Sequence, residues 1–335
     1  MRIDGHKLEF HPRRVAEWAE SGDDWEKART VYPIYVEVSP VGACNHRCTF
    51  CAVDYIGYQP VILDHNLLLD SLQEMYDLGV KSAMFAGEGE PLLHKHINHI
   101  VEMTPQDVAF TTNGVLLDRL ESLSRCSWVK VSLNSGTEET YNRVHRAKSG
   151  DWAKVWANLK DAARRKGACT LGVQMVVLPE NEHEAPLLQK MCEDIGVDYV
   201  VFKPYSQHRF SITRQYDGYK PVNLPEGRKT VVRKDAIATT AHAYDRCNAT
   251  PFFWAYVMAT GDVYSCSAYL KDERFRLGNL NTETFRQIWE GEKRKANWRF
   301  VRNELDIKEC RVNCRMDKAN RYLAEFETLP HINFI

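Results

Sequence analysis

Between residues 34 and 204, short apolar segments alternate with longer amphipathic segments. The short segments are rich in β-branched and aromatic residues, which is typical of strands, and the long ones carry apolar residues at helical spacing. This alternation predicts βα units and a parallel sheet. Six units close most of a barrel, so we expect an α/β fold with a partial (β/α)6 TIM-like barrel. Its strands are expected at 34–38, 82–86, 108–112, 129–133, 171–178 and 199–203, and its helices at 67–78, 94–103, 116–123, 152–166 and 184–195.

Polar residues cluster where each expected strand ends. In barrels of βα units the carboxyl ends of the strands meet on one rim, which is where active sites lie. We therefore expect these clusters to surround one site. They are Cys44–Cys51, Gly87–Pro91, Thr111–Gly114, Ser132–Ser135, Leu178–Asn181 and Lys203–His208.

The first of these clusters contains Cys44, Cys48 and Cys51. Three thiolates can hold one side of an iron–sulfur cube, which normally takes four Cys ligands. An open coordination position marks a metal centre that does chemistry. A zinc site completed by His46 is an alternative. A disulfide with one incidental Cys is disfavoured, because the chain shows no secretory signal.

Composition excludes several classes of function. The formal net charge is −1, so the whole protein has no electrostatic footprint for nucleic acid. No apolar run reaches about 18 residues, so no membrane span is expected. The N-terminus lacks the basic-then-apolar pattern of a signal peptide. We expect a cytoplasmic location, where ten Cys serve as metal ligands or core thiols rather than in disulfides.

The spacing of Cys44, Cys48 and Cys51, with an aromatic Phe50 before the last Cys, resembles the signature of the radical S-adenosylmethionine (SAM) superfamily. The resemblance implies that these Cys hold a [4Fe–4S] cluster whose open iron chelates SAM. It also implies that the reduced cluster splits SAM into methionine and a 5′-deoxyadenosyl radical. An external electron donor of the flavodoxin or ferredoxin type follows from the same resemblance.

The turn Gly87-Glu88-Gly89-Glu90-Pro91 resembles the family's glycine-and-glutamate turn, which binds the SAM amino group through backbone carbonyls. Its glycines let the backbone approach closely. Many members have Gly-Gly-Glu-Pro, so Glu88 is an extra residue. Glu88 is compatible with the turn and is counted with its SAM-binding residues, and an ordinary solvated carboxylate is the alternative.

Four further residues are implied as SAM contacts. Asn113 and Ser132 match positions that line the SAM ribose and carboxylate in relatives. Asn134 is nearby, but alternation along a strand leaves its direction open. Arg146 resembles the arginine that reaches the SAM carboxylate, which a guanidinium can bind with two parallel hydrogen bonds. A surface arginine at a helix end is the alternative.

A second set of Cys lies far along the chain. Residues 258–266 predict a hairpin of strand, Thr-Gly-Asp turn and strand that ends in a Cys. The set resembles the auxiliary-cluster extension called SPASM, or its shorter form, twitch. A full SPASM extension carries about seven Cys, whereas four match one fully ligated [4Fe–4S] cluster. A structural zinc site is the alternative. The four implied ligands are Cys247, Cys266, Cys310 and Cys314.

The remaining three Cys look structural, since free Cys is among the most buried residue types; they are Cys126, Cys169 and Cys192. Four regions are expected. These are a helical extension packed on the barrel (1–33), the radical SAM barrel (34–204), a substrate-facing linker (205–246), and a SPASM/twitch-like domain with the C-terminal tail (247–335).

A fully ligated second cluster cannot bind substrate without losing a ligand, so its natural use is to accept an electron. The favoured reaction is therefore oxidation of C–OH to C=O. A thiol hydrogen donor would instead give epimerisation, and decarboxylation is a further alternative. A non-catalytic iron–sulfur or zinc scaffold would bind no SAM, and the polar clusters at the strand ends argue against it.

Charge near the barrel mouth indicates the substrate class. Residues 203–234 hold eight Lys or Arg and two acidic residues, which suits a phosphate or carboxylate; a solvated basic linker is the alternative. We expect a small, anionic, polyhydroxylated molecule such as a sugar, cyclitol or nucleotide-linked sugar. Peptide maturation is a further alternative, although only about forty residues precede Cys44, too few for a peptide-recognition domain. The substrate-contacting residues expected are Lys203, Tyr205, Gln207 and His208.

Overall fold

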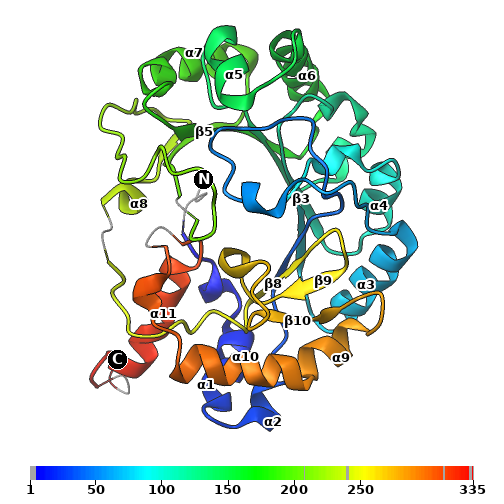
Figure 1. Cartoon of the computed structure of the whole chain (residues 1–335), viewed down its shortest axis with the longest axis vertical. Helices are drawn as coiled ribbons and strands as arrows, with labels where there is room; N and C mark the ends of the chain where they lie inside the picture. Colours follow the sequence, from blue (N-terminus) through cyan, green and yellow to red (C-terminus); the bar gives the residue numbers. More distant parts are fainter. Residues whose placement is uncertain (1–4, 207, 239–240, 312–313, 332–333, 335) are drawn as a thin grey trace.

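The computed structural model describes residues 5–206, 208–238, 241–311, 314–331 and 334. Its ten strands form one sheet in the order β10-β9-β8-β1-β2-β3-β4-β5-β6-β7. Figure 1 shows this sheet curving into a partial barrel, with helices outside it. The strands are β1 (Tyr35–Val38), β2 (Ser82–Phe85), β3 (Asp107–Thr112), β4 (Trp128–Ser132), β5 (Thr170–Val177), β6 (Tyr199–Pro204), β7 (Thr230–Val232), β8 (Trp254–Val257), β9 (Asp262–Tyr264) and β10 (Arg276–Asn279).

The α/β fold with a parallel sheet is confirmed, and residues 34–204 hold the six predicted strands, β1 to β6. Two further parallel strands come from later parts of the chain. β7 pairs in parallel with β6, and β8 pairs in parallel with β1, so the parallel run is longer on both edges. β7 has three residues, which is too short for a periodic signal. β8 comes from the second Cys region, more than 200 residues after its partner, so no local pattern could place it.

Five α-helices cover the outer face of the sheet (Figure 1). In α3, Asp64 caps the helix by accepting from the backbone N–H groups of Asn66 and Leu67. Leu68 and Leu72 follow at a spacing of four and are buried against the sheet. The five are α3 (His65–Asp77), α4 (Ile97–Met103), α5 (Glu138–His145), α6 (Asp151–Arg165) and α7 (Ala185–Ile195).

The helix expected at 116–123 was wrong. The structure has two 3-10 turns there, Leu117–Arg119 and Glu121–Arg125. Leu117, Leu120 and Leu123 are fully buried, and their spacing of three matches the three-residue turn of a 3-10 helix. α5 was not anticipated as an element.

The N-terminal helices pack against the C-terminal region. They form one apolar cluster with Phe252, Phe253 and Trp298. Arg294 is fully buried and donates to the carbonyls of Ala28 and Val31, which ties the two regions together. The helices concerned are α1 (Pro12–Ser21) and α2 (Trp25–Ala28), and then α9 (Phe285–Glu290), α10 (Glu292–Asn303) and α11 (Asp317–Thr328). α8 (Lys234–Ala238) follows β7.

Side chains alternate across the sheet and separate two environments. Val129 and Val131 of β4 lie in the main core between sheet and helices. Lys130 and Ser132, the alternate residues, therefore face the inside of the barrel. Across the described residues, no helix is both long and apolar enough to cross a membrane.

Candidate active site

The loop after β1 carries Cys44, Cys48 and Cys51 across the carboxyl ends of the strands (Figure 1). Two backbone hydrogen bonds hold it to the end of α5. The N–H of Arg47 donates to the carbonyl of His145 at 3.1 Å, and the N–H of Thr49 donates to that of Val144 at 2.8 Å. The register of these bonds places Cys48 directly against the last turn of the helix.

The three thiols converge on one space. Each is partly buried. Burial, with the Glu90 carboxylate second, raises the pKa of the Cys44 thiol to about 12. Burial also raises the pKa of Cys48, and the other two thiols of the group raise it further, as near neighbours would. Three converging thiols are a donor set that fits three corners of an iron–sulfur cube.

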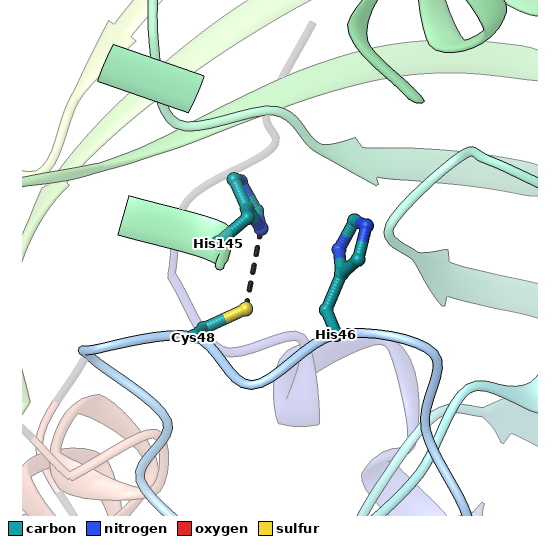
Figure 2. A group of neighbouring side chains, drawn as sticks. All are labelled: His46, Cys48 and His145. Carbon is teal, nitrogen blue, oxygen red and sulfur yellow. Dashed lines mark hydrogen bonds between the residues drawn. The ribbon is translucent and has the colours of Figure 1, made fainter. Parts of the chain in front are cut away.

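His145 lies against this group, although sequence reasoning did not single it out. Its Nδ1 is 3.2 Å from the Cys48 Sγ, and its Nε2 is 2.9 Å from the carbonyl oxygen of Leu133 (Figure 2). A carbonyl only accepts, so Nε2 carries the proton. His46, proposed in the zinc alternative, lies within 4.8 Å of Cys48 and His145, and its Nε2 is 3.1 Å from the Asp151 carboxylate.

The Gly87–Pro91 turn packs directly on the Cys loop. The N–H of Glu90 donates to the carbonyl of Ala43 at 2.9 Å. The buried Glu90 carboxylate accepts from the Thr112 hydroxyl at 2.6 Å and from the N–H of Asn113 at 2.8 Å. Glu90 therefore joins the loops that follow β1, β2 and β3 into one rim.

The backbone around Gly89 leaves no room for a side chain. A Cβ at this position would overlap the backbone carbonyl oxygens of Val41 and Ala43, which cannot move without displacing the Cys loop.

We expect Gly89→Ala to destabilise the protein by about 1–3 kcal/mol and to lower the iron bound after anaerobic reconstitution. Gly196→Ala is the matched control, since its Cβ meets open space and only the positive φ adds strain. That control should cost about 1–2 kcal/mol and bind full iron. Equal iron in both variants would contradict the role of Gly89.

The structure excludes the alternative of a solvated carboxylate for Glu88, and its role in binding SAM stays a prediction. Glu88 is 4% exposed and accepts from the backbone N–H of Ala259 at 2.8 Å. Ala259 lies in the turn between β8 and β9. Glu88 thus links the Gly turn to the second Cys region, a long-range contact with no local sequence signal.

The implied SAM contacts lie in different surroundings. Asn113 donates to the Asn45 side chain at 2.7 Å, beside Cys44. Ser132 faces the barrel interior and accepts from Gln174 at 3.1 Å. Asn134 is fully buried, and its side-chain oxygen accepts from the N–H of Val176 at 2.7 Å. Arg146 ends α5 in an exposed, left-handed conformation. The structure brings the first two to the rim, and the roles of all four stay predictions.

The four Cys of the second set come together from distant segments. The predicted hairpin is confirmed as β8, a turn and β9, and Cys266 follows it. Burial raises the pKa of the Cys266 thiol, and the neighbouring thiols of Cys314 and Cys247 raise it further, as close neighbours do. The Tyr269 hydroxyl lies 3.0 Å from the Cys310 Sγ. Four gathered thiols are the donor set of a closed cluster.

A cavity of about 500 Å³ lies beside the second Cys group. Cys310 lines one side of it. Tyr216 lines another, and its hydroxyl is 2.8 Å from the Thr49 hydroxyl, between Cys48 and Cys51. The lining also includes Pro204, Tyr205, Arg209, Arg214, Lys220, Glu309 and Arg311.

The expected substrate residues differ in where they lie relative to this cavity. Tyr205 lines it, and Lys203 precedes the lining residue Pro204. His208 is buried, and its Nε2 is 3.0 Å from the carbonyl of Ser267. Burial lowers the pKa of His208 to about 4. Gln207 lies outside the described residues.

Comparison with known families identifies both Cys regions. Residues 38–191 match the model of the radical SAM superfamily, and residues 247–315 match SPASM, an iron-sulfur cluster-binding domain. The second match decides between iron and zinc for the C-terminal set. The first domain binds a [4Fe–4S] cluster and SAM, as expected from the sequence.

Curated relatives match only part of the chain. The GTP 3′,8-cyclase of Microcystis aeruginosa is 31% identical over 160 residues, which are 43% of this chain and 48% of that protein. That of Gloeobacter violaceus is 33% identical over 187 residues, 51% of this chain and 56% of that protein. The chain thus spans about half the length of the curated relatives it matches.

Solved structures resemble nearly the whole fold. Streptococcus suis SuiB bound to precursor peptide SuiA aligns with a TM-score of 0.65 and 13% identity, over 96% of this chain and 78% of that one. The structure of anSMEcpe with bound AdoMet aligns with a TM-score of 0.59 and 18% identity, over 81% and 83%. With both family matches on the two Cys regions, the chain belongs to the radical SAM superfamily and carries a SPASM iron–sulfur domain.

Proposed function

We propose that this enzyme oxidises a C–OH group of a small, anionic, polyhydroxylated molecule to C=O. The cavity beside Cys310 carries the proposal. One wall reaches the first Cys loop through the Tyr216–Thr49 contact, and another wall contains Cys310. A substrate held there would lie beside both centres. The volume of about 500 Å³ is in the range of small-molecule sites.

The charge of the cavity favours an anion. Arg209 is ion-paired with Glu309, while Lys220 and Arg311 add positive charge to the same walls. An excess of fixed cations in a cleft raises the local concentration of anionic ligands. The curated relatives are named for GTP, a phosphorylated ribose compound, which supports the same substrate class.

The two Cys groups have different proposed roles. Cys44, Cys48 and Cys51 are proposed to hold the SAM-binding cluster, and the four Cys of the second set its auxiliary partner. When bound, these groups supply a 5′-deoxyadenosyl radical and a one-electron acceptor. Over one turnover the substrate carbon loses one hydrogen atom and one electron, and the hydroxyl loses its proton to solvent. Two electrons and two protons leave in total, which balances C–OH to C=O.

Placement of the other Cys favours oxidation over epimerisation. Epimerisation needs a hydrogen donor such as a thiol on the side of the substrate opposite the radical. Cys126, Cys169 and Cys192 lie in the core between sheet and helices, away from the cavity. Peptide modification is the competing function; the likeness to peptide-bound SuiB, at 13% identity, concerns the fold.

The product's mass tests the proposal. In heavy water, with reconstituted enzyme and candidate phosphorylated sugars or nucleotides, we expect a product two hydrogens lighter than the substrate. No solvent deuterium should enter the oxidised carbon, and 5′-deoxyadenosine should carry the hydrogen from that carbon. A product isomeric with the substrate and carrying one deuterium would show epimerisation instead. Turnover with peptides alone would assign the enzyme to peptide modification.

A further inference from the structure

Each sulfur of the second Cys group has a hydrogen-bond donor beside it. Two of these donors are backbone groups. The N–H of Ala268 lies 3.4 Å from the Cys266 Sγ, and the N–H of Met316 lies 3.4 Å from the Cys314 Sγ. In both cases the donor comes two residues after the Cys, and every residue type except Pro has such an N–H. These two bonds therefore depend on the conformation of the loop and not on a particular side chain.

Tyr269 supplies the third donor, from its side chain. Its hydroxyl lies 3.0 Å from the Cys310 Sγ. Tyr269 is 2% exposed, and its ring is stacked on that of Phe275 with 4.0 Å between the centroids and 6° between the planes, which fixes the direction of the hydroxyl. A Cys that binds iron does so as a thiolate, which only accepts. The hydroxyl is therefore the donor when the cluster is bound.

Asn320 of α11 supplies the fourth donor. Its side-chain nitrogen lies 3.4 Å from the Cys247 Sγ. Its side-chain oxygen accepts from the backbone N–H of Asn248 at 2.7 Å and from that of Ala249 at 2.8 Å. Those two donors determine which end of the amide is the oxygen, so the NH2 group faces the sulfur. Asn320 is 2% exposed, which keeps bulk water away from this bond.

Donors at the sulfurs act unequally on the two redox states of an iron–sulfur cluster. Reduction adds a negative charge, and part of that charge resides on the sulfurs. A hydrogen-bond donor stabilises the added charge, and it does so more strongly in a buried site of low dielectric constant. Hydrogen bonds to the sulfurs are accordingly among the factors that set the reduction potential of such clusters. Buried donors therefore favour the reduced state, which is what an electron acceptor requires.

We propose that Tyr269 and Asn320 are positioning residues that raise the reduction potential of the cluster held by the second Cys group. They thereby help it to accept an electron from the substrate radical. The electron-accepting role rests on the oxidation proposed above, whereas the effect on the potential does not. A merely structural role would change stability and iron content but leave the potential of the bound cluster where it is, so the potential is the quantity to measure.

A redox titration followed by electron paramagnetic resonance tests this inference. It uses the reconstituted full chain with SAM, and the same chain with Cys44, Cys48 and Cys51 replaced by Ala, which isolates the signal of the second cluster. Tyr269→Phe should lower the equilibrium constant for reduction by about threefold to tenfold, and tenfold is about 59 mV for one electron. Asn320→Asp keeps an oxygen for the two backbone donors but loses the NH2 group. It should lower the potential by at least as much.

Tyr264→Phe is the matched control. Tyr264 is 1% exposed and belongs to the same apolar cluster as Tyr269, and its hydroxyl accepts from the backbone of Lys271 instead of facing a Cys. Its replacement removes an equally buried hydroxyl from the same region. The control should bind full iron, and its potential should equal that of the unsubstituted protein.

The outcomes separate this inference from the proposed reaction. Tyr269→Phe protein with full iron and an unchanged or raised potential would refute the tuning role, and so would an equal shift in Tyr264→Phe. Tyr269→Phe decides the question even where Asn320→Asp loses iron. A lowered potential in Tyr269→Phe, combined with no oxidised product from any candidate substrate, would support the tuning role and refute the proposed reaction. Oxidised product together with an unchanged potential would refute the tuning role alone.

Discussion

Replacing Cys44, Cys48 and Cys51 together with Ala is expected to abolish reductive cleavage of SAM. Iron in the reconstituted protein should fall from about eight to about four per chain, because one of two four-iron cubes is lost. The expectation rests on the convergence of the three thiols at the rim and on the radical SAM match across 38–191. The measurements are iron analysis and chromatographic detection of 5′-deoxyadenosine after reduction with dithionite.

Cys192→Ala provides the matched control for this triple variant. Cys192 is fully buried in the main core and is not in either group of ligands. Its replacement should lower stability slightly while iron near eight per chain and SAM cleavage are kept. If the triple variant still bound about eight iron, the assignment of the first cluster's ligands would be wrong.

Cys310→Ala is expected to separate SAM cleavage from product formation. Cys310 is the second-group thiol that lines the cavity. Without it the auxiliary cluster loses a ligand, and the substrate radical loses its electron acceptor. Product should fall by at least about 100-fold, while some 5′-deoxyadenosine still forms as the first Cys group is intact. Both products are quantified in the same reaction mixtures.

Tyr269→Phe is the control for Cys310→Ala. It removes only the hydroxyl that lies 3.0 Å from the Cys310 sulfur and keeps the ring stacked on Phe275. We expect both clusters to persist and product to fall by no more than about tenfold. Cys310→Ala protein that folds, cleaves SAM and still forms product at the normal rate would eliminate the electron-acceptor role.

Local patterns in the sequence were sufficient to predict the strands of the central barrel. The strands from β1 to β6 begin and end within one or two residues of the predicted ranges. Their apolar runs and the capped, amphipathic helices between them are short-range signals, and each is read within about 5 to 15 residues. The α-helix expected at 116–123 was wrong because local spacing is ambiguous there. Leucines three residues apart are compatible with both an α-helix and a 3-10 helix over so short a stretch.

The candidate site was only partly predictable. The spacing of Cys44, Cys48 and Cys51 and the rule that active sites lie at strand ends were enough to locate the first centre. His145 was missed, since its place beside Cys48 depends on a backbone pairing between the Cys loop and α5. The buried contact of Glu88 with Ala259 was not predicted, because the turn that buries Glu88 comes from residues about 170 positions later.

The order of residues along the chain was enough to predict which segments are strands and which Cys are candidates for the group of three and for the group of four. What the two groups share depends on how the whole chain folds. The parallel pairing of β8 with β1 carries the SPASM region onto the barrel's own sheet, so Cys310 comes to the cavity that Tyr216 joins to the first loop. Such contacts follow from burial and strand register over the whole chain, and these act at separations that no local spacing of residues records.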